Sequence, residues 1–81
     1  MALDMNDLDI FLGKKIAFFR AKMDWPLKTL ANLLGISIQQ LQRYEKGVNK
    51  ISASLLYEMA KIFHMDISCF FEAYHDEKIP E

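Results

Sequence analysis

The stretch GISIQQLQRYEKG, residues 35 to 47, combines a turn with the start, body and end of a short helix. Gly35 can adopt the positive φ that ends a preceding helix. Ser37 is a favourable N-cap, and Gln40 three residues later completes the pattern of a capping box. The sequence therefore predicts two helices joined by a tight turn, the second running from about Ile38 to Lys46.

The predicted helix after this turn has one apolar and one polar side. Leu41, Tyr44 and Glu45 fall together at helical spacing, so Leu41 is expected to anchor the helix. Another side of the helix carries Gln39, Gln42 and Arg43. Glutamine and arginine pair bidentately with adenine and guanine edges in the major groove. Two short helices joined by such a turn are the arrangement of a helix-turn-helix reader.

Charge is distributed unevenly along the chain, although the formal net charge is only −1. Residues 14–50 carry eight basic and two acidic side chains, whereas residues 1–13 and 51–81 are both net acidic. Contact with phosphate depends on local charge more than on the total. Because the basic segment coincides with the predicted reader, we expect it to face nucleic acid. The alternative is a randomly mixed, solvated surface.

Length and composition predict one domain over residues 1–81, with a core of about 7–75 and a polar tail, 76–81, that frays. The chain has 81 residues, 52% of them apolar, with three glycines and two prolines, which suits one modest core. It has no run of about 18 apolar residues, so no membrane helix is expected. Its acidic start lacks a signal-peptide pattern. The single cysteine, Cys69, excludes an internal disulfide and fits a reducing cytoplasm.

Apolar residues at helical spacing predict an all-α, compact five-helix domain. The first helix runs from about Asp7 to Met23. Its expected buried stripe is Leu12, Ile16, Phe19 and Met23. Pro26 suits the first turn of the second helix, and Ser52 and Asp66 are expected to cap the fourth and fifth helices.

These features resemble the phage lambda repressor and Cro-like family of helix-turn-helix proteins, also called the XRE family. The resemblance covers roughly residues 12–71. The family has an Arg late in helix one, a Leu-Ala pair in helix two, a Gly turn, and a third helix ending Tyr-Glu-x-Gly. The matching residues are Arg20, Leu30-Ala31, Gly35 and Tyr44-Glu45-Lys46-Gly47. Two positions depart from the pattern: Pro26-Leu27 replace a Ser or Thr followed by Gln, and Ile51 replaces a frequent Pro.

The resemblance implies a sequence-specific transcriptional regulator of double-stranded DNA, and we expect a repressor that acts as a dimer. The expected base contacts are Ile38, Gln39, Gln42 and Arg43. The expected phosphate contacts are Lys28, Ser37, Lys46, Asn49 and Lys50. The family's structural ion pair corresponds to Arg20 and Glu45. For Ile38, packing at the helix start is an equal alternative to contact with a thymine methyl group.

The predicted fifth helix suggests how two copies associate. Its apolar residues are Ile67, Phe70, Phe71 and Tyr74. In an α-helix Phe70 is turned about 100° from Phe71, and a small core is not expected to cover both directions. An exposed aromatic patch predicts a two-fold interface, with recognition helices about 34 Å apart on a near-palindromic operator. The alternative is that both phenylalanines complete the monomer core.

Other classes of function find less support. We expect no enzyme and no cofactor, because no catalytic constellation or Gly-rich phosphate loop is present. His64, Cys69 and His75 do not form a convergent metal-ligand set, so no metal is expected. Trp25 and Tyr57 are expected to pack in the domain rather than stack on bases. Two alternatives remain: an antitoxin that binds both DNA and a toxin, and a protein-interaction module that has lost DNA binding.

Overall fold

A computed structural model describes residues 6–74 and shows an all-α chain over that range. The elements in chain order are α1 (Asn6–Lys22), α2 (Leu27–Leu34), α3 (Ile38–Glu45), α4 (Ala53–Ile62) and the 3₁₀ helix η1 (Ile67–Phe71). The all-α prediction is confirmed, but the fifth α-helix is wrong, because a 3₁₀ helix stands in its place. His75 and the expected polar tail lie outside the described residues. None of the helices within them has the length and apolar character needed to cross a membrane.

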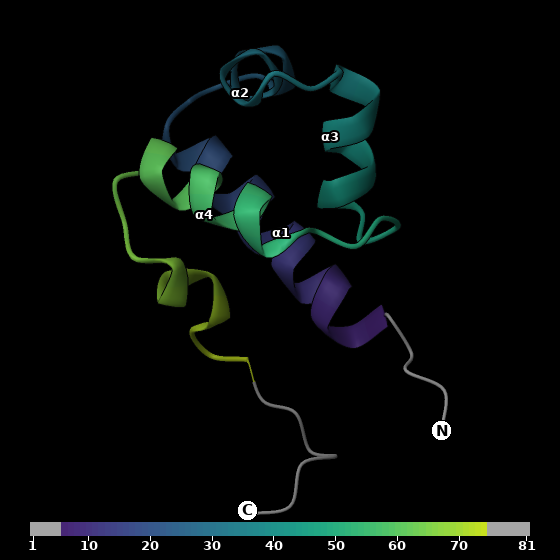
Figure 1. Ribbon diagram of the computed structural model, residues 1–81, viewed down its shortest axis with the longest axis vertical. Coiled ribbons are helices and arrows are strands. Elements are labelled where there is room, and N and C mark those ends of the chain that lie inside the picture. Colours follow the sequence, from purple (N-terminus) through teal and green to yellow (C-terminus); the bar gives the residue numbers. More distant parts are fainter. Residues whose placement is uncertain (1–5, 75–81) are drawn as a thin grey trace, which may run out of the picture.

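The helices pack around α1, which runs diagonally through the centre of Figure 1. α1 packs against α3 and η1, α2 packs against α3 and α4, and α4 packs against η1. In Figure 1, α2 is seen nearly end-on at the top while α3 descends the right-hand side, so their axes cross at a wide angle. α3 therefore lies at the edge of the molecule, with one side against α1 and the other toward solvent.

All four α-helices of the described chain end in the same hydrogen-bonded turn. After α2, the Gly35 N–H donates to the Asn32 carbonyl (3.1 Å) and the Ile36 N–H to the Ala31 carbonyl (3.0 Å). These two hydrogen bonds to the last turn of the helix form the Schellman motif, which places one residue in the left-handed region. In these four turns the residues in that conformation are Asp24, Gly35, Gly47 and His64. The turn at Gly35 is thus confirmed as predicted.

The core is one cluster to which all five elements contribute. Its buried members are Leu12, Ile16, Leu30, Ala31, Leu41, Leu56, Met59, Ala60 and Phe70. Leu41 is fully buried, which confirms it as the anchor of α3. Met23 does not complete the stripe of α1, because α1 ends at Lys22 and the Met23 side chain is exposed in the turn that follows.

The η1 segment corrects the prediction that Phe70 is an exposed interface residue. Phe70 is 0% exposed, and its ring centroid lies 5.7 Å from that of Phe19 and 6.4 Å from that of Phe63. A 3₁₀ helix has three residues per turn, so residues i and i+3 share a side. Ile67 and Phe70 therefore face the core together. Phe71 is 40% exposed, so the core covers one phenylalanine and not the other.

The backbones of α1 and α3 meet at Gly13. A Cβ atom on Gly13 would lie 2.5 Å from the carbonyl oxygens of both Tyr44 and Glu45. No side chain separates the two helices at this point, and Gly13 itself is buried. Glycine is therefore required here by the close approach of two backbones, a requirement that the local sequence pattern does not reveal.

Substitution of Gly13 by alanine tests this contact, because the close approach and ordinary helix propensity predict opposite changes in the free energy of unfolding. In an ordinary helix interior, alanine is more stable than glycine by about 0.5–1 kcal/mol. At Gly13 the added methyl group meets backbone, so we expect Gly13→Ala to lower the free energy of unfolding by about 1–3 kcal/mol.

The control is Ala21→Gly at an exposed position of the same helix, which is expected to lose about 0.5–1 kcal/mol. Urea unfolding of both variants gives the comparison. A Gly13→Ala variant more stable than the unsubstituted chain would contradict the close approach.

Candidate nucleic-acid interface

The turn before α3 is closed by the Ser37 side chain. Its Oγ accepts a hydrogen bond from the Gln40 N–H at 3.0 Å, which satisfies one orphan amide of the helix. The predicted capping box is only half formed, because the Gln40 side chain turns along the helix and its Nε2 donates to the Tyr44 hydroxyl at 3.5 Å. Ser37 itself is exposed, so its hydroxyl remains accessible at the helix start.

The outer side of α3 presents all four residues predicted to contact bases. Ile38, Gln39, Gln42 and Arg43 are all exposed. Tyr44 and Glu45 are half-buried on the inner side beside Leu41. Within residues 6–74, the side chains of Gln39, Gln42 and Arg43 take part in no hydrogen bond or ion pair. These three polar groups are therefore available to an external partner.

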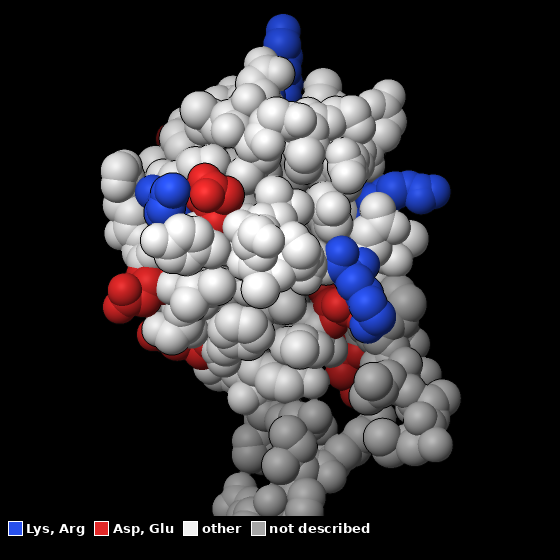
Figure 2. All heavy atoms as spheres, in the orientation of Figure 1, with Lys and Arg blue, Asp and Glu red and all other residues white. Residues whose placement is uncertain are grey.

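The residues predicted to contact phosphate lie on α2, at the start of α3 and in the loop that follows it. Lys28, Ser37, Lys46 and Lys50 are exposed, whereas Asn49 is half-buried. Figure 2 shows basic side chains projecting from the upper and right-hand edges of the molecule, where Figure 1 places α2 and α3. The positive charge predicted for residues 14–50 therefore borders the outer side of α3.

Lys50 has an intramolecular partner that the sequence analysis missed. Its Nζ lies 3.3 Å from Oδ2 of Asp9 in the first turns of α1. The two residues are 41 positions apart, so no local spacing rule connects them. The sequence signal that could have revealed this pair is Asp9, an acidic residue within the predicted first helix, whose apolar residues face the core.

The predicted ion pair between Arg20 and Glu45 is present and bidentate. Arg20 Nε donates to Glu45 Oε2 at 2.7 Å, and Nη2 donates to Oε1 at 3.0 Å. A third bond runs from Arg20 Nη1 to the Trp25 carbonyl at 2.8 Å. The side chains are only 19% and 11% exposed, and hydrogen bonding to Glu45 raises the pKa of Arg20 above its ordinary value. The pair joins the end of α1, the turn after it and the end of α3.

The remaining candidates from the sequence divide between the core and the surface. Trp25 is half-buried and stacks on Phe63 at a centroid distance of 6.0 Å, as expected for a packing residue. Tyr57 does not pack inside, because it is exposed on α4 with Lys61 over its ring. Cys69 is half-buried. No cluster of three or more potential metal ligands occurs within residues 6–74.

Comparison with known proteins identifies similar chains. Residues 16–68 match a family model described as helix-turn-helix. An uncharacterized HTH-type transcriptional regulator of Sinorhizobium medicae is 39% identical over 67 residues, which is 83% of this chain and 48% of the relative. An uncharacterized transcriptional regulator in the ATPase CF(0) region of Rhodospirillum rubrum is 39% identical over 67 residues, which is 83% of this chain and 62% of the relative.

A Rickettsia conorii HTH-type regulator, also uncharacterized, is 35% identical over 77 residues, which is 95% of this chain and 62% of the relative. This chain thus spans roughly half to two thirds of the length of the relatives it matches.

Removal of the Glu45 carboxylate tests the ion pair. Among the described residues, Glu45→Ala leaves the guanidinium of Arg20 with the Trp25 carbonyl as its one remaining partner. Because the pair is largely but not fully shielded, we expect a loss of about 1–3 kcal/mol, between the values for exposed and buried pairs.

The control is Glu58→Ala on α4, whose pair with Lys61 spans 3.4 Å between side chains that are both exposed. Its removal is expected to cost about 0.5 kcal/mol or less. Thermal unfolding distinguishes the two variants, and equal melting temperatures would show that the Arg20 pair contributes nothing beyond a surface contact.

Proposed function

Because this chain belongs to the XRE and Cro-like helix-turn-helix family, we propose that it is a sequence-specific transcriptional regulator that binds double-stranded DNA. The observation that carries the proposal is the exposed polar side of α3, with Gln39, Gln42 and Arg43 on a helix anchored by Leu41. Relatives named as HTH-type transcriptional regulators support the same assignment. No catalytic chemistry is part of the proposal.

In the proposed complex, α3 enters the major groove and α2 crosses the backbone. A helix in the groove presents its outward side chains to base edges, where glutamine and arginine can form bidentate pairs. The exposed Ile38 at the start of α3 can contact a thymine methyl group. Contacts to phosphates then fix the orientation of the helix. These contacts come from Lys28, Ser37, Lys46, Asn49 and Lys50. Occlusion of a promoter by this complex would repress transcription.

We further propose that two copies bind one near-palindromic operator through the η1 surface. Phe70 is excluded from this surface by its burial, and Ile67 faces the core with it, so the exposed Phe71 remains as the contact, followed in the chain by the half-buried Tyr74. A two-fold axis applies such a patch to its own copy and can space two recognition helices about 34 Å apart, one turn of DNA.

The proposal is tested by selecting bound duplexes from a random pool with the unsubstituted chain and with Gln39→Ala. The unsubstituted chain should enrich one sequence. Gln39→Ala should bind that sequence more weakly by about 1–3 kcal/mol and relax the preference at one base pair.

Gln40→Ala is the matched control, because Gln40 is an exposed glutamine on the same helix whose side chain turns toward Tyr44. It should leave the selected sequence unchanged. Failure of the unsubstituted chain to enrich any duplex would refute the proposed function, whereas an unchanged selection with Gln39→Ala would remove only Gln39 as a reader.

The proposed dimer predicts different outcomes at two exposed phenylalanines. Phe71→Glu should give a folded protein that is monomeric at tens of micromolar and binds its operator weakly, because a charge cannot be buried unpaired in an apolar interface. Phe18→Glu on α1, at a residue 53% exposed compared with 40% for Phe71, should leave association unchanged.

Light scattering gives the mass of each variant, and circular dichroism verifies its helical content. A monomeric unsubstituted chain at the same concentration, or a Phe71→Glu variant that remains dimeric, would place the interface elsewhere or remove it.

A further inference from the structure

The pair formed by Asp9 and Lys50 joins two groups with very different surroundings. Asp9 is 7% exposed and belongs to α1, so its carboxylate is held in place by the helix. The Lys50 side chain is 66% exposed, and its Nζ lies 3.3 Å from Asp9 Oδ2. A lysine ammonium has three donors. Lys50 is thus a largely exposed cation paired with a buried anion.

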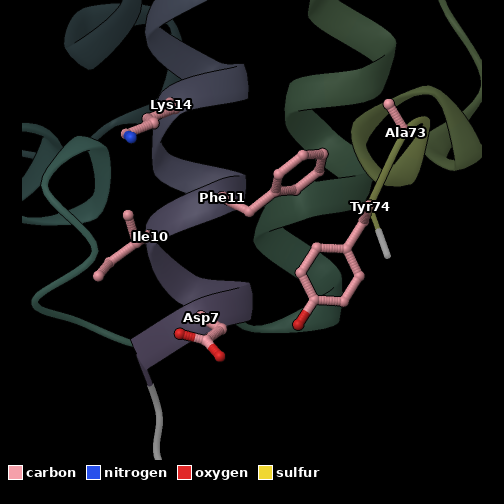
Figure 3. A pocket seen from close by; sticks show the side chains of 6 residues that line it. All are labelled: Asp7, Ile10, Phe11, Lys14, Ala73 and Tyr74. Atoms are coloured by element: carbon pink, nitrogen blue, oxygen red, sulfur yellow. The ribbon is translucent and has the colours of Figure 1, made fainter. Parts of the chain in front are cut away.

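The loop that carries Lys50 is fixed against the same part of α1. A Cβ atom on Gly47 would lie 2.7 Å from the Cα of Ile10, so the backbones of the loop and of α1 are in direct contact. In Figure 3, Ile10 lies on the side of α1 that faces this loop, and together with Asp7, Phe11 and Lys14 it lines a pocket closed by Ala73 and Tyr74. The contact holds the loop against α1, which keeps the backbones that carry Lys50 and Asp9 close together.

We propose that Asp9 competes with DNA phosphate for Lys50 and thereby weakens the binding of DNA. The inference rests on the proposed function, because Lys50 is one of the proposed phosphate contacts and Asp9 would limit its contribution. In the free protein the ammonium is partly neutralised by Asp9. Binding of a phosphate must share or displace this partner, so Lys50 releases fewer counterions and contributes less affinity than an unpaired lysine.

Lys46 supplies the internal comparison. It lies in the same loop region and is exposed, and it forms no ion pair with any of residues 6–74. An unpaired lysine that contacts phosphate contributes about 0.9 to the slope of log affinity against log salt concentration. The competition predicts that Lys50 contributes less than Lys46 to this slope, although both carry the same charge.

The experiment measures binding to a short duplex of arbitrary sequence over a range of salt concentrations, because the electrostatic component of binding does not depend on sequence. Asp9→Asn removes the charge and keeps the shape of the side chain. We expect it to tighten binding roughly two- to five-fold, the effect of one partly exposed ion pair, and to steepen the salt slope by up to about 0.9.

Asp7→Asn is the matched control, since it makes the same change of charge two residues away without breaking an ion pair within the described chain. Its effect should be smaller. In a Lys50→Gln background, Asp9→Asn should gain no more than Asp7→Asn does. An equal gain from Asp9→Asn with and without Lys50 would show general repulsion and overturn the competition. Weaker binding by Asp9→Asn would overturn it too, because Asp9 would then position Lys50 for phosphate.

Circular dichroism first establishes that Asp9→Asn is folded. If it does not fold, Lys50→Gln and Lys46→Gln carry the test, because both change exposed side chains. Lys50→Gln should reduce the salt slope less than Lys46→Gln, and equal or larger reductions would overturn the competition. If the unsubstituted chain itself shows no salt-dependent binding, the proposed function fails together with this inference. Binding that is unaffected by Asp9→Asn refutes the inference alone.

Discussion

The direct contact between the backbones of α1 and α3 determines where the polar side of α3 lies. At Gly13 the carbonyl groups at the end of α3 rest on α1 with no side chain between them. The bidentate pair of Arg20 with Glu45 acts seven residues further along α1, at the same end of α3. The contact limits the distance between the helices, and the planar fork of the arginine limits the rotation of α3 about its axis. Because both constraints act on the side of α3 that faces α1, the side chains on its outer side take no part in the packing.

Most of the elements that local rules describe were predicted correctly from the sequence, although Asp66, predicted to cap the last helix, makes no side-chain cap bond. Gly35 ends α2, and Ser37 and Ser52 cap the helices that follow, because each of these roles depends on the residue and its immediate neighbours. Leu41 and Ile16 are buried as their spacing indicates. The ion pair of Arg20 with Glu45 was predicted only through the family resemblance, and its bidentate geometry was not predicted. The exposure of the proposed readers also follows from helical spacing, although exposure alone leaves their contact with bases a prediction.

Several features that the sequence did not reveal share a cause, which is that the deciding interaction is distant in sequence. The four residues from Ile67 to Phe70 read equally well as an α-helix or a 3₁₀ helix, and only packing against Phe19 and Phe63 selects the inward face of Phe70. Asp24 and His64 adopt positive φ without being glycine, since the paths of the next segments require that turn. The partner of Lys50 lies 41 residues away, and the requirement for glycine at position 13 comes from the other end of α3.

The separation of the two sides of α3 has an evolutionary consequence. Gln39, Gln42 and Arg43 are exposed and make no side-chain bond within residues 6–74, so exchanges there break no polar contact of the described domain. Surface substitutions of this kind usually change stability by less than about 0.5 kcal/mol. A gene duplicate could therefore drift through many combinations at these three positions while folding as before. Gly13 and Glu45 have no such freedom, so under the proposed function descendants of this chain are expected to diverge in what they recognise long before they diverge in shape.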